Sequence, residues 1–451
     1  MDIRFLLVLA CCAAFIASTD RVVVAQGVVA EGPDPTTATP IHFARIPAEP
    51  IPLPPIDSES KDALMTLAEA ESLTLGAHPA LREAGGMVRS AQGQWLQSGL
   101  RPNPTIGYQG EEIGDEGHAG MQGGYFSQEF VTAGKLGLSR SVALREVAAA
   151  EQKLERTRLQ VLTTVRMYYY ESLAAERALA LAKQLEQVGS QALQASELRL
   201  NALEGTKAAM LQSQVEYNSA QLLAEQATNR RDAARRRLAS IVGSQESITA
   251  PLEDTLGSKL PTLDWETART RLLAESPELA QLRFEVDGAR WAVQRQVAGR
   301  VPNVTVMSGA QYDYATEFAM ANVQVSMPIP VFNRNQGNIA TASGQLVAAQ
   351  SALEARELSL TQQLATAMGD YLTASRRVAR YTSSILPAAR QSLDLVSSAY
   401  EQGELEYLDI LNTQRTYTEK NIGYLNDLES AWKKWAEIDG LLVGPLQTSN
   451  N

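Results

Sequence analysis

The side chains that most often do chemistry are few and scattered in this sequence. Its histidines are His42, His78 and His118, and no two of them have a spacing that lets imidazoles share a metal ion. Its cysteines, Cys11 and Cys12, both lie in an apolar N-terminal segment. No glycine-rich phosphate loop follows a predicted strand, so nothing indicates ATP binding. We therefore predict no catalytic residue, no metal site and no cofactor, and we do not expect an enzyme.

The densest group of polar side chains lies between two predicted strands. Carboxylates in such a loop can hold a divalent cation, but an acidic run is more often solvated, and we expect a solvated loop here. His78 precedes Pro79 just as Ser276 precedes Pro277, so we assign His78 to a turn and not to a set of ligands. The group consists of Glu111, Glu112, Asp115, Glu116 and His118.

The N-terminus has the composition of a secretory signal peptide, and we assign residues 1–25 to it. Arg4 precedes an apolar stretch from Phe5 to Ala17, which is too short to cross a bilayer as a helix. Small residues before Gln26 offer a cleavage site. Lipid attachment at Cys11 stays open as an alternative, because the residues before it loosely resemble a lipid-attachment box.

Two halves of the chain repeat one order of elements: a helix, a Pro-Asn step, a β-hairpin, a very long helix, a tip and a returning helix. A proline-rich, extended tail at residues 26–61 comes first. The first repeat spans 62–252, with its hairpin at 105–130 and its tip near 201–207. The second spans 253–440, with its hairpin at 303–327 and its tip near 401–407, and a tail follows at 441–451.

The long helices are far longer than a globular domain needs. No proline lies between Pro104 and Pro251, and we expect one helix from about Lys135 to Leu203. At 1.5 Å per residue it would be roughly 100 Å long. Pro387 lies inside the second long tract, and we expect a kink there because proline removes a backbone donor.

The strands alternate between apolar and polar residues. Val323 and Val325 share one face of the last strand, while Asn322 and Gln324 share the other. A half-buried sheet in a soluble domain is the ordinary interpretation, but the signal peptide and the long helices favour a membrane. We therefore predict that Val304, Val306, Val323 and Val325 face lipid. The aromatic residues expected at the membrane interfaces are Tyr108, Tyr125, Phe126, Tyr312, Tyr314 and Phe318.

Four strands cannot close a barrel, and open strand edges are not tolerated in lipid. Several copies of the chain must then contribute to one barrel. The formal net charge of −11 also argues against a nucleic-acid partner.

The order and spacing of these features resemble the outer-membrane efflux proteins of the TolC family. The resemblance covers about residues 62 to 440 and is carried mainly by Pro328–Gly337, after the last strand, and by Ala399–Gln414. Ser127-Gln128-Glu129-Phe130 followed by Ala133-Gly134-Lys135 is similar to the cation-efflux (CzcC-like) branch.

The resemblance implies a mainly α fold with a small membrane β part. Three copies would form a twelve-stranded β-barrel continuous with a long α-helical barrel, in the bacterial outer membrane and extending into the periplasm. The partners it implies are two further copies of the chain, outer-membrane lipid, a periplasmic adaptor and an inner-membrane RND-type pump.

The implied function is the exit duct of a tripartite efflux system for heavy-metal cations or other small solutes. A type I protein secretion or multidrug system remains the alternative. A periplasmic coiled-coil adaptor is less favoured, because it would carry one helical hairpin and not two repeats.

The resemblance also assigns two groups of functional residues. An acidic ring can narrow the periplasmic entrance in family members, and the matching positions here are Asp409, Asn412 and Leu211. Only the first is acidic, which weakens the expectation of a strongly cation-selective entrance, and Asp409 can equally be a solvated or helix-capping carboxylate. The tips expected to contact the adaptor consist of Leu203, Glu204, Gly205, Gln402, Gly403, Glu404 and Leu405.

Overall fold

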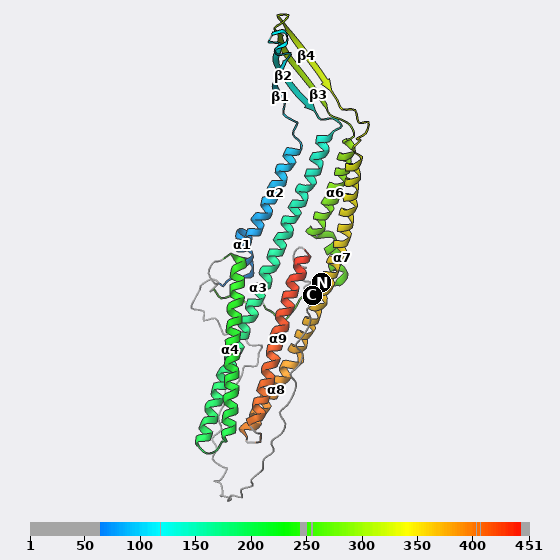
Figure 1. The fold of residues 1–451 in the computed structure, drawn as a ribbon. Coiled ribbons are helices and arrows are strands. Elements are labelled where there is room, and N and C mark those ends of the chain that lie inside the picture. The colour runs from blue at the N-terminus through cyan, green and yellow to red at the C-terminus, as the bar shows by residue number, and fades with distance from the viewer. Residues whose placement is uncertain are drawn as a thin grey trace, which may run out of the picture. The chain divides into compact units, whose positions relative to one another are not determined.

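A computed structural model describes residues 64–117, 119–243, 250–253, 256–402, 404–405 and 407–442. All of them belong to one of two compact units, Phe43–Asn451, and everything below concerns that unit (Figure 1). The predicted signal peptide, the proline-rich tail, His42, His118, Gly403 and all but the first residues of the C-terminal tail lie outside the described residues.

The strands form one antiparallel sheet in the order β1-β2-β3-β4. Its members are β1 (Thr105–Glu111), β2 (Met121–Phe130), β3 (Val304–Asp313) and β4 (Phe318–Ser326). β1 and β2 form one hairpin, β3 and β4 form the other, and the hairpins join through β2 and β3, where Phe126 pairs with Ser308. The two repeats therefore build one continuous sheet.

The helices follow the same order twice. The first repeat has α1 (Leu67–Ala77), α2 (Pro79–Ser98), α3 (Lys135–Asn201) and α4 (Lys207–Val242). The second has α5 (Trp265–Glu275), α6 (Pro277–Ala298), α7 (Gln336–Arg380), α8 (Leu386–Glu401) and α9 (Tyr407–Leu441). Among the described residues, no helix is both long and apolar enough to cross a membrane.

Local sequence explains where several helices begin. Thr66 and Glu69 form a reciprocal capping box at α1, while the Thr206 and Asp264 side chains accept backbone N–H groups at the starts of α4 and α5. Pro79 and Pro277 lie in the first turns of α2 and α6, where a missing N–H costs nothing. The His78 side chain accepts a hydrogen bond from the Ala80 N–H, so His78 caps α2.

Helix α3 connects the two repeats. It packs against α2 and α4 of its own repeat and against α6 and α9 of the other. Helix α7 packs against α6 and α9, and α8 packs against α9. Figure 1 shows the strands at one end of these helices and the turns between α3 and α4 and between α8 and α9 at the other.

A buried tyrosine anchors each long helix to extended segments outside the helices: Met65 lies before α1, while Glu253 and Pro261 lie in the connection between the repeats. The Tyr169 hydroxyl donates to the carbonyl oxygens of Met65 at 2.9 Å and Glu253 at 2.8 Å. The Tyr371 hydroxyl donates to the Pro261 carbonyl at 2.5 Å. Burial raises the pKa of both phenols, so both remain protonated donors at neutral pH.

Pro387 is accommodated by a local change of helix type. A single π-helical turn, Tyr381–Ile385, lies between α7 and α8, and Pro387 falls in the first turn of α8. A proline inside a regular α-helix removes one hydrogen bond and collides with the preceding turn. Wider π turns relieve this conflict and are a usual cause of helix bends.

Candidate functional site

One face of the sheet is apolar and exposed. The strand pairing places Ile106, Phe126, Val323 and Val325 on this face together with Val304 and Val306. Ile106 is 81% exposed, Val323 72% and Val325 66%, while Val304 and Val306 are half-buried. Among the described elements, no helix packs against the sheet in more than marginal contact. This apolar face is therefore uncovered within one copy of the chain.

The opposite, polar face is crowded by close pairs of small and large residues. A Cβ on Gly107 would lie 2.5 Å from the Tyr125 ring, and a Cβ on Gly309 would lie 2.5 Å from Asn322 Oδ1. Small residues let a sheet curve, and curvature towards this face is needed if the apolar face is to lie outside a barrel.

The aromatic residues predicted at the membrane interfaces do not all share one face of the sheet. The pairing register puts Tyr125 and Phe318 on the polar face, whereas Tyr108, Phe126 and Tyr312 lie on the apolar face. Tyr125 lies there because its ring occupies the space above Gly107. The aromatic residues predicted at the membrane interfaces are therefore divided between the two faces of the sheet, and their position at a membrane interface stays a prediction.

Both outer edges of the sheet are open. β1 and β4 each pair on one side only, so each presents a row of backbone donors and acceptors to its surroundings. Neighbouring strands alternate in direction throughout, so β4 of one copy would meet β1 of the next in the same antiparallel sense.

A hydrogen-bonded cluster joins the foot of the sheet to α3. The Lys135 Nζ donates to Asn303 Oδ1 at 2.6 Å, and the Asn303 amide donates to the Glu129 carboxylate at 2.7 Å. The Thr132 hydroxyl donates to the Pro302 carbonyl at 2.6 Å. Burial, together with the charge of Arg295, lowers the pKa of Lys135. The repeated Pro-Asn step was the sequence signal for this cluster, but its partners could not be read from the sequence.

The first helical tip ends in a strained, exposed leucine. Leu203 has a φ of 63° and is 93% exposed. The N–H groups of Glu204 and Gly205 donate to the Arg199 carbonyl at 2.9 and 3.0 Å, which closes the end of α3. A side chain at positive φ is normally avoided, so a large apolar residue there is a candidate contact for another protein.

The second tip has the same closing hydrogen bond. The Glu404 N–H donates to the Ala399 carbonyl at 2.9 Å, while Gln402, Glu404 and Leu405 are exposed. The two tips also touch: the Arg199 guanidinium donates to the Tyr400 hydroxyl, and its central carbon lies 5.8 Å from the centre of the Tyr400 ring. Sequence reasoning missed this link.

The structure does not bring all three predicted entrance residues together within one copy. Asp409 and Asn412 lie about one turn apart near the start of α9, and both are exposed. Leu211 lies in α4 and is also exposed. Helix α3 packs against both α4 and α9, and α4 also contacts α9 directly, because the Arg230 guanidinium of α4 pairs with the Glu429 carboxylate of α9.

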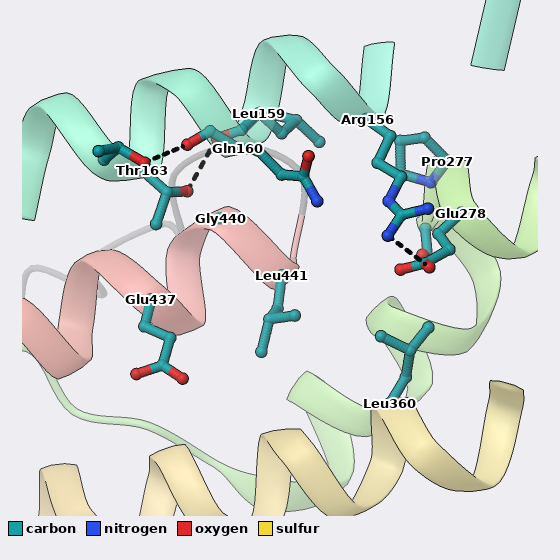
Figure 2. Close-up of a pocket in the computed structure, with 12 residues that line it drawn as sticks. Arg156, Leu159, Gln160, Thr163, Pro277, Glu278, Leu360, Glu437, Gly440 and Leu441 are labelled. Carbon is teal, nitrogen blue, oxygen red and sulfur yellow. Dashed lines mark hydrogen bonds and ion pairs between the residues drawn. The ribbon is translucent and has the colours of Figure 1, made fainter. Parts of the chain in front are cut away.

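A cavity of about 270 Å³ lies where α3, α6, α7 and α9 meet (Figure 2). Arg156 forms an ion pair with Glu278 at 2.9 Å, and Arg356 holds the same carboxylate at 2.8 Å. Gly440 directly contacts the Thr163 side chain and leaves no room for a Cβ, so α3 and α9 cross closely. The ion pairs and the crossing account for these residues as structural ones. No cluster of three or more potential metal-ligating side chains occurs within the described residues.

Comparison with known proteins agrees with this architecture. The sequence pattern of the outer membrane efflux proteins matches residues 71–244 and 268–442, one match for each repeat. The cobalt-zinc-cadmium resistance protein CzcC of Cupriavidus metallidurans is 27% identical over 379 residues, which are 84% of this chain and 90% of CzcC.

Two other proteins are more distant. The alkaline protease secretion protein AprF of Pseudomonas aeruginosa is 25% identical over 284 residues, 60% of this chain and 59% of AprF. The structure of CusC has a TM-score of 0.71 at 18% identity and covers 90% of this chain and 99% of CusC. The predicted fold, mainly α with a small four-stranded sheet, is confirmed. The chain belongs to the outer membrane efflux protein family and is a channel protein of the outer membrane, not an enzyme.

Proposed function

We propose that three copies of this chain form the exit duct of a tripartite efflux system. The observation that carries this proposal is a four-stranded sheet with an exposed apolar face and two open edges. In lipid the apolar face is stable, but each open edge must be paired. Three copies supply about twelve strands, which is within the range of known membrane barrels.

The pairing between the two repeats predicts how β4 of one copy pairs with β1 of the next. We call this pairing the seam between copies. Thr105 pairs with Ser127 and Thr305 pairs with Ser326, so β3 corresponds to β1 and β4 corresponds to β2. Phe126 of β2 pairs with Ser308 of β3 across the junction between the repeats. The corresponding pair at the outer edges is Val325 of one copy and Tyr108 of the next.

Oxidative cross-linking tests this seam. Cysteines at Val325 and Tyr108 would lie opposite each other across the seam, within the Cα separation of about 4.4–6.8 Å that a disulfide needs. The double variant V325C/Y108C is expected to yield a covalent trimer on oxidation. The control V323C/Y108C is shifted by two residues, to a diagonal separation of about 7–8 Å, and is expected to remain monomeric in denaturant. Cross-linking of the control alone would contradict the register.

We place heavy-metal cations first among the substrates. The support is the relation to CzcC, which covers more of the chain than the relation to AprF does. Asp409, Asn412 and Leu211 would line the entrance, with Asp409 favouring cations over anions.

Growth of a deletion strain tests the substrate. Loss of the gene is expected to lower tolerance to zinc, cobalt or cadmium salts, with secretion of proteases unchanged. The reverse result, normal metal tolerance with lost secretion, would favour the protein-secretion alternative that AprF represents.

The two tips are the proposed contacts for a periplasmic adaptor, through which an inner-membrane pump would act. The support is Leu203, which is exposed at a strained backbone position where burial in a partner would be favourable. Leu203→Ser is expected to reduce co-purification of the adaptor without changing the trimer. Leu222→Ser, at an exposed position within α4, is the matched control. Equal loss of adaptor in both variants would remove the tip from the interface.

A further inference from the structure

Three of the four segments that join the helices to the sheet share one charge pattern, and the fourth, 131–134 between β2 and α3, contains no charged residue. We name as the collar the connections 99–104 between α2 and β1, 299–303 between α6 and β3, and 327–335 between β4 and α7. Each contains one arginine, namely Arg101, Arg300 and Arg334, and none contains Asp or Glu. All three arginines are exposed.

The turns at the opposite end of the strands carry the opposite charge. The connection between β1 and β2 holds Glu112 and Asp115, and the connection between β3 and β4 holds Glu317. Neither connection contains Lys or Arg. The two ends of the sheet therefore differ in sign, with the basic end next to the helices.

The collar is also apolar. Phe332 is 92% exposed and Ile329 is 79% exposed, and Val301 in the second connection is exposed as well. Lone exposed apolar residues are ordinary, but here they share short segments with the arginines and continue from the apolar face of the sheet. Aromatic and aliphatic side chains next to arginines are typical of the boundary between acyl chains and headgroups.

We propose that the collar binds anionic phospholipid headgroups of the periplasmic leaflet. This inference rests on the proposed membrane position of the sheet. Phe332 and Ile329 would enter the acyl boundary, while the guanidinium groups of Arg101, Arg300 and Arg334 would pair with phosphates, which they match in geometry. The collar segments contain three arginines and no carboxylate, although Glu129 of β2 lies against Asn303, so the collar carries net positive charge and favours anionic lipid over zwitterionic lipid.

The preference for anionic lipid is measured from the lipid that stays bound to the extracted protein. The full chain is reconstituted in vesicles of equal parts phosphatidylglycerol and phosphatidylcholine, re-extracted in mild detergent, and the two bound lipids are quantified by mass spectrometry. Phosphatidylglycerol is expected to be enriched on the wild-type protein. Its enrichment should fall by about fivefold for each arginine replaced, the equivalent of roughly 1 kcal/mol per charge.

The decisive variants are R101Q, R300Q and R334Q, singly and together. Arg415→Gln is the matched control, because Arg415 is an exposed arginine in α9, which packs on α3, α7 and α8. Wild-type enrichment should also disappear near 1 M salt, where the screening length is only about 3 Å. Unchanged enrichment in the triple variant would overturn the proposal.

A further variant separates lipid from a second copy of the chain as the occupant. Phe332→Ser is expected to lower retention of both lipids and leave the trimer intact. A dissociated trimer with unchanged lipid retention would assign the collar to the contact between copies and overturn the proposal. Failure of the wild-type protein to insert into vesicles would instead contradict the proposed function.

Discussion

The two repeats follow the same order of elements but are stabilised differently. One buried cluster, around Tyr169 and Leu238 of the first repeat, also includes Val378 and Leu428 of the second. The cluster around Tyr371 contains buried residues of the second repeat alone. The first repeat therefore shares its core with the second, whereas the second repeat also has a buried cluster of its own.

The long arms differ in the same way. In the first repeat α3 is uninterrupted and packs against helices of both repeats. In the second, the arm is divided into α7, a π turn and α8. The arm that packs extensively against helices of both repeats is the regular one. The interrupted arm packs mainly on helices of its own repeat and touches the first repeat through Val378 and Tyr400.

The largest expected effect comes from placing a charge on the apolar face of either hairpin. Phe126 and Val325 occupy corresponding positions on the apolar face. Arginine at either position is expected to destabilise the inserted protein, by up to about 2–4 kcal/mol, the cost at the membrane midplane, and by less at Val325 because it lies two residues from the collar. Stability is measured by denaturant titration in lipid vesicles.

Gln324→Arg on the polar face is the control and is expected to insert normally. Damage at Val325 but not at Phe126 would show that the two hairpins do not share one lipid-facing surface.

The next effect concerns the π turn, which only the second repeat has. A Cβ on Gly423 of α9 would lie 2.6 Å from the Tyr381 hydroxyl. Gly423→Ala is expected to cost about 1–3 kcal/mol through overpacking. Gly369→Ala, in open space on α7, should be neutral or slightly stabilising. Thermal unfolding measures both.

Removal of the Tyr381 hydroxyl tests the cause of the stability loss expected for Gly423→Ala. Tyr381→Phe should restore most of the stability lost in Gly423→Ala. No rescue would mean that the backbone of α9, and not the Tyr381 hydroxyl, resists the added methyl group.

A smaller difference separates the two anchoring tyrosines. Tyr169 donates to two carbonyls and Tyr371 donates to one. Each phenylalanine variant loses about 1 kcal/mol for its hydrogen bond, and Tyr169→Phe loses more because it leaves two acceptors unsatisfied. Equal losses by denaturant titration would show that the second acceptor is satisfied by water.

The smallest effect appears only in alkali. Burial raises the pKa of Tyr170 to about 12, above its ordinary value of 10.0. The unfolded chain therefore releases this proton first, and folded stability falls as the pH rises above about 10. Tyr170→Phe should reduce this alkaline loss, which is followed by the pH of half-unfolding. An unchanged midpoint would assign the loss to other groups.

The features that could be predicted from the sequence are those that depend on neighbouring residues, namely the faces of the strands and the positions of the turns. Alternation placed Val323 and Val325 on one face, and the Gly and Pro punctuation located both hairpins and both tips. Alternation also places Tyr125 on the face opposite Phe126, but only the pairing with β1 reveals that Gly107 leaves room for the Tyr125 ring. The Arg199–Tyr400 and Lys135–Asn303 contacts join residues far apart in the chain, and no local propensity encodes such pairs.

The π turn at Tyr381–Ile385 also changes the heptad register of the second arm. A regular helix rotates about 100° per residue, and a π turn accommodates one extra residue without adding a full turn. The side-chain phase of α8 is therefore offset from that of α7 by roughly one residue, so no single heptad register can describe both. Alignments of this arm should place a one-residue insertion at 381–385, and relatives that lack it should also lack the proline that follows.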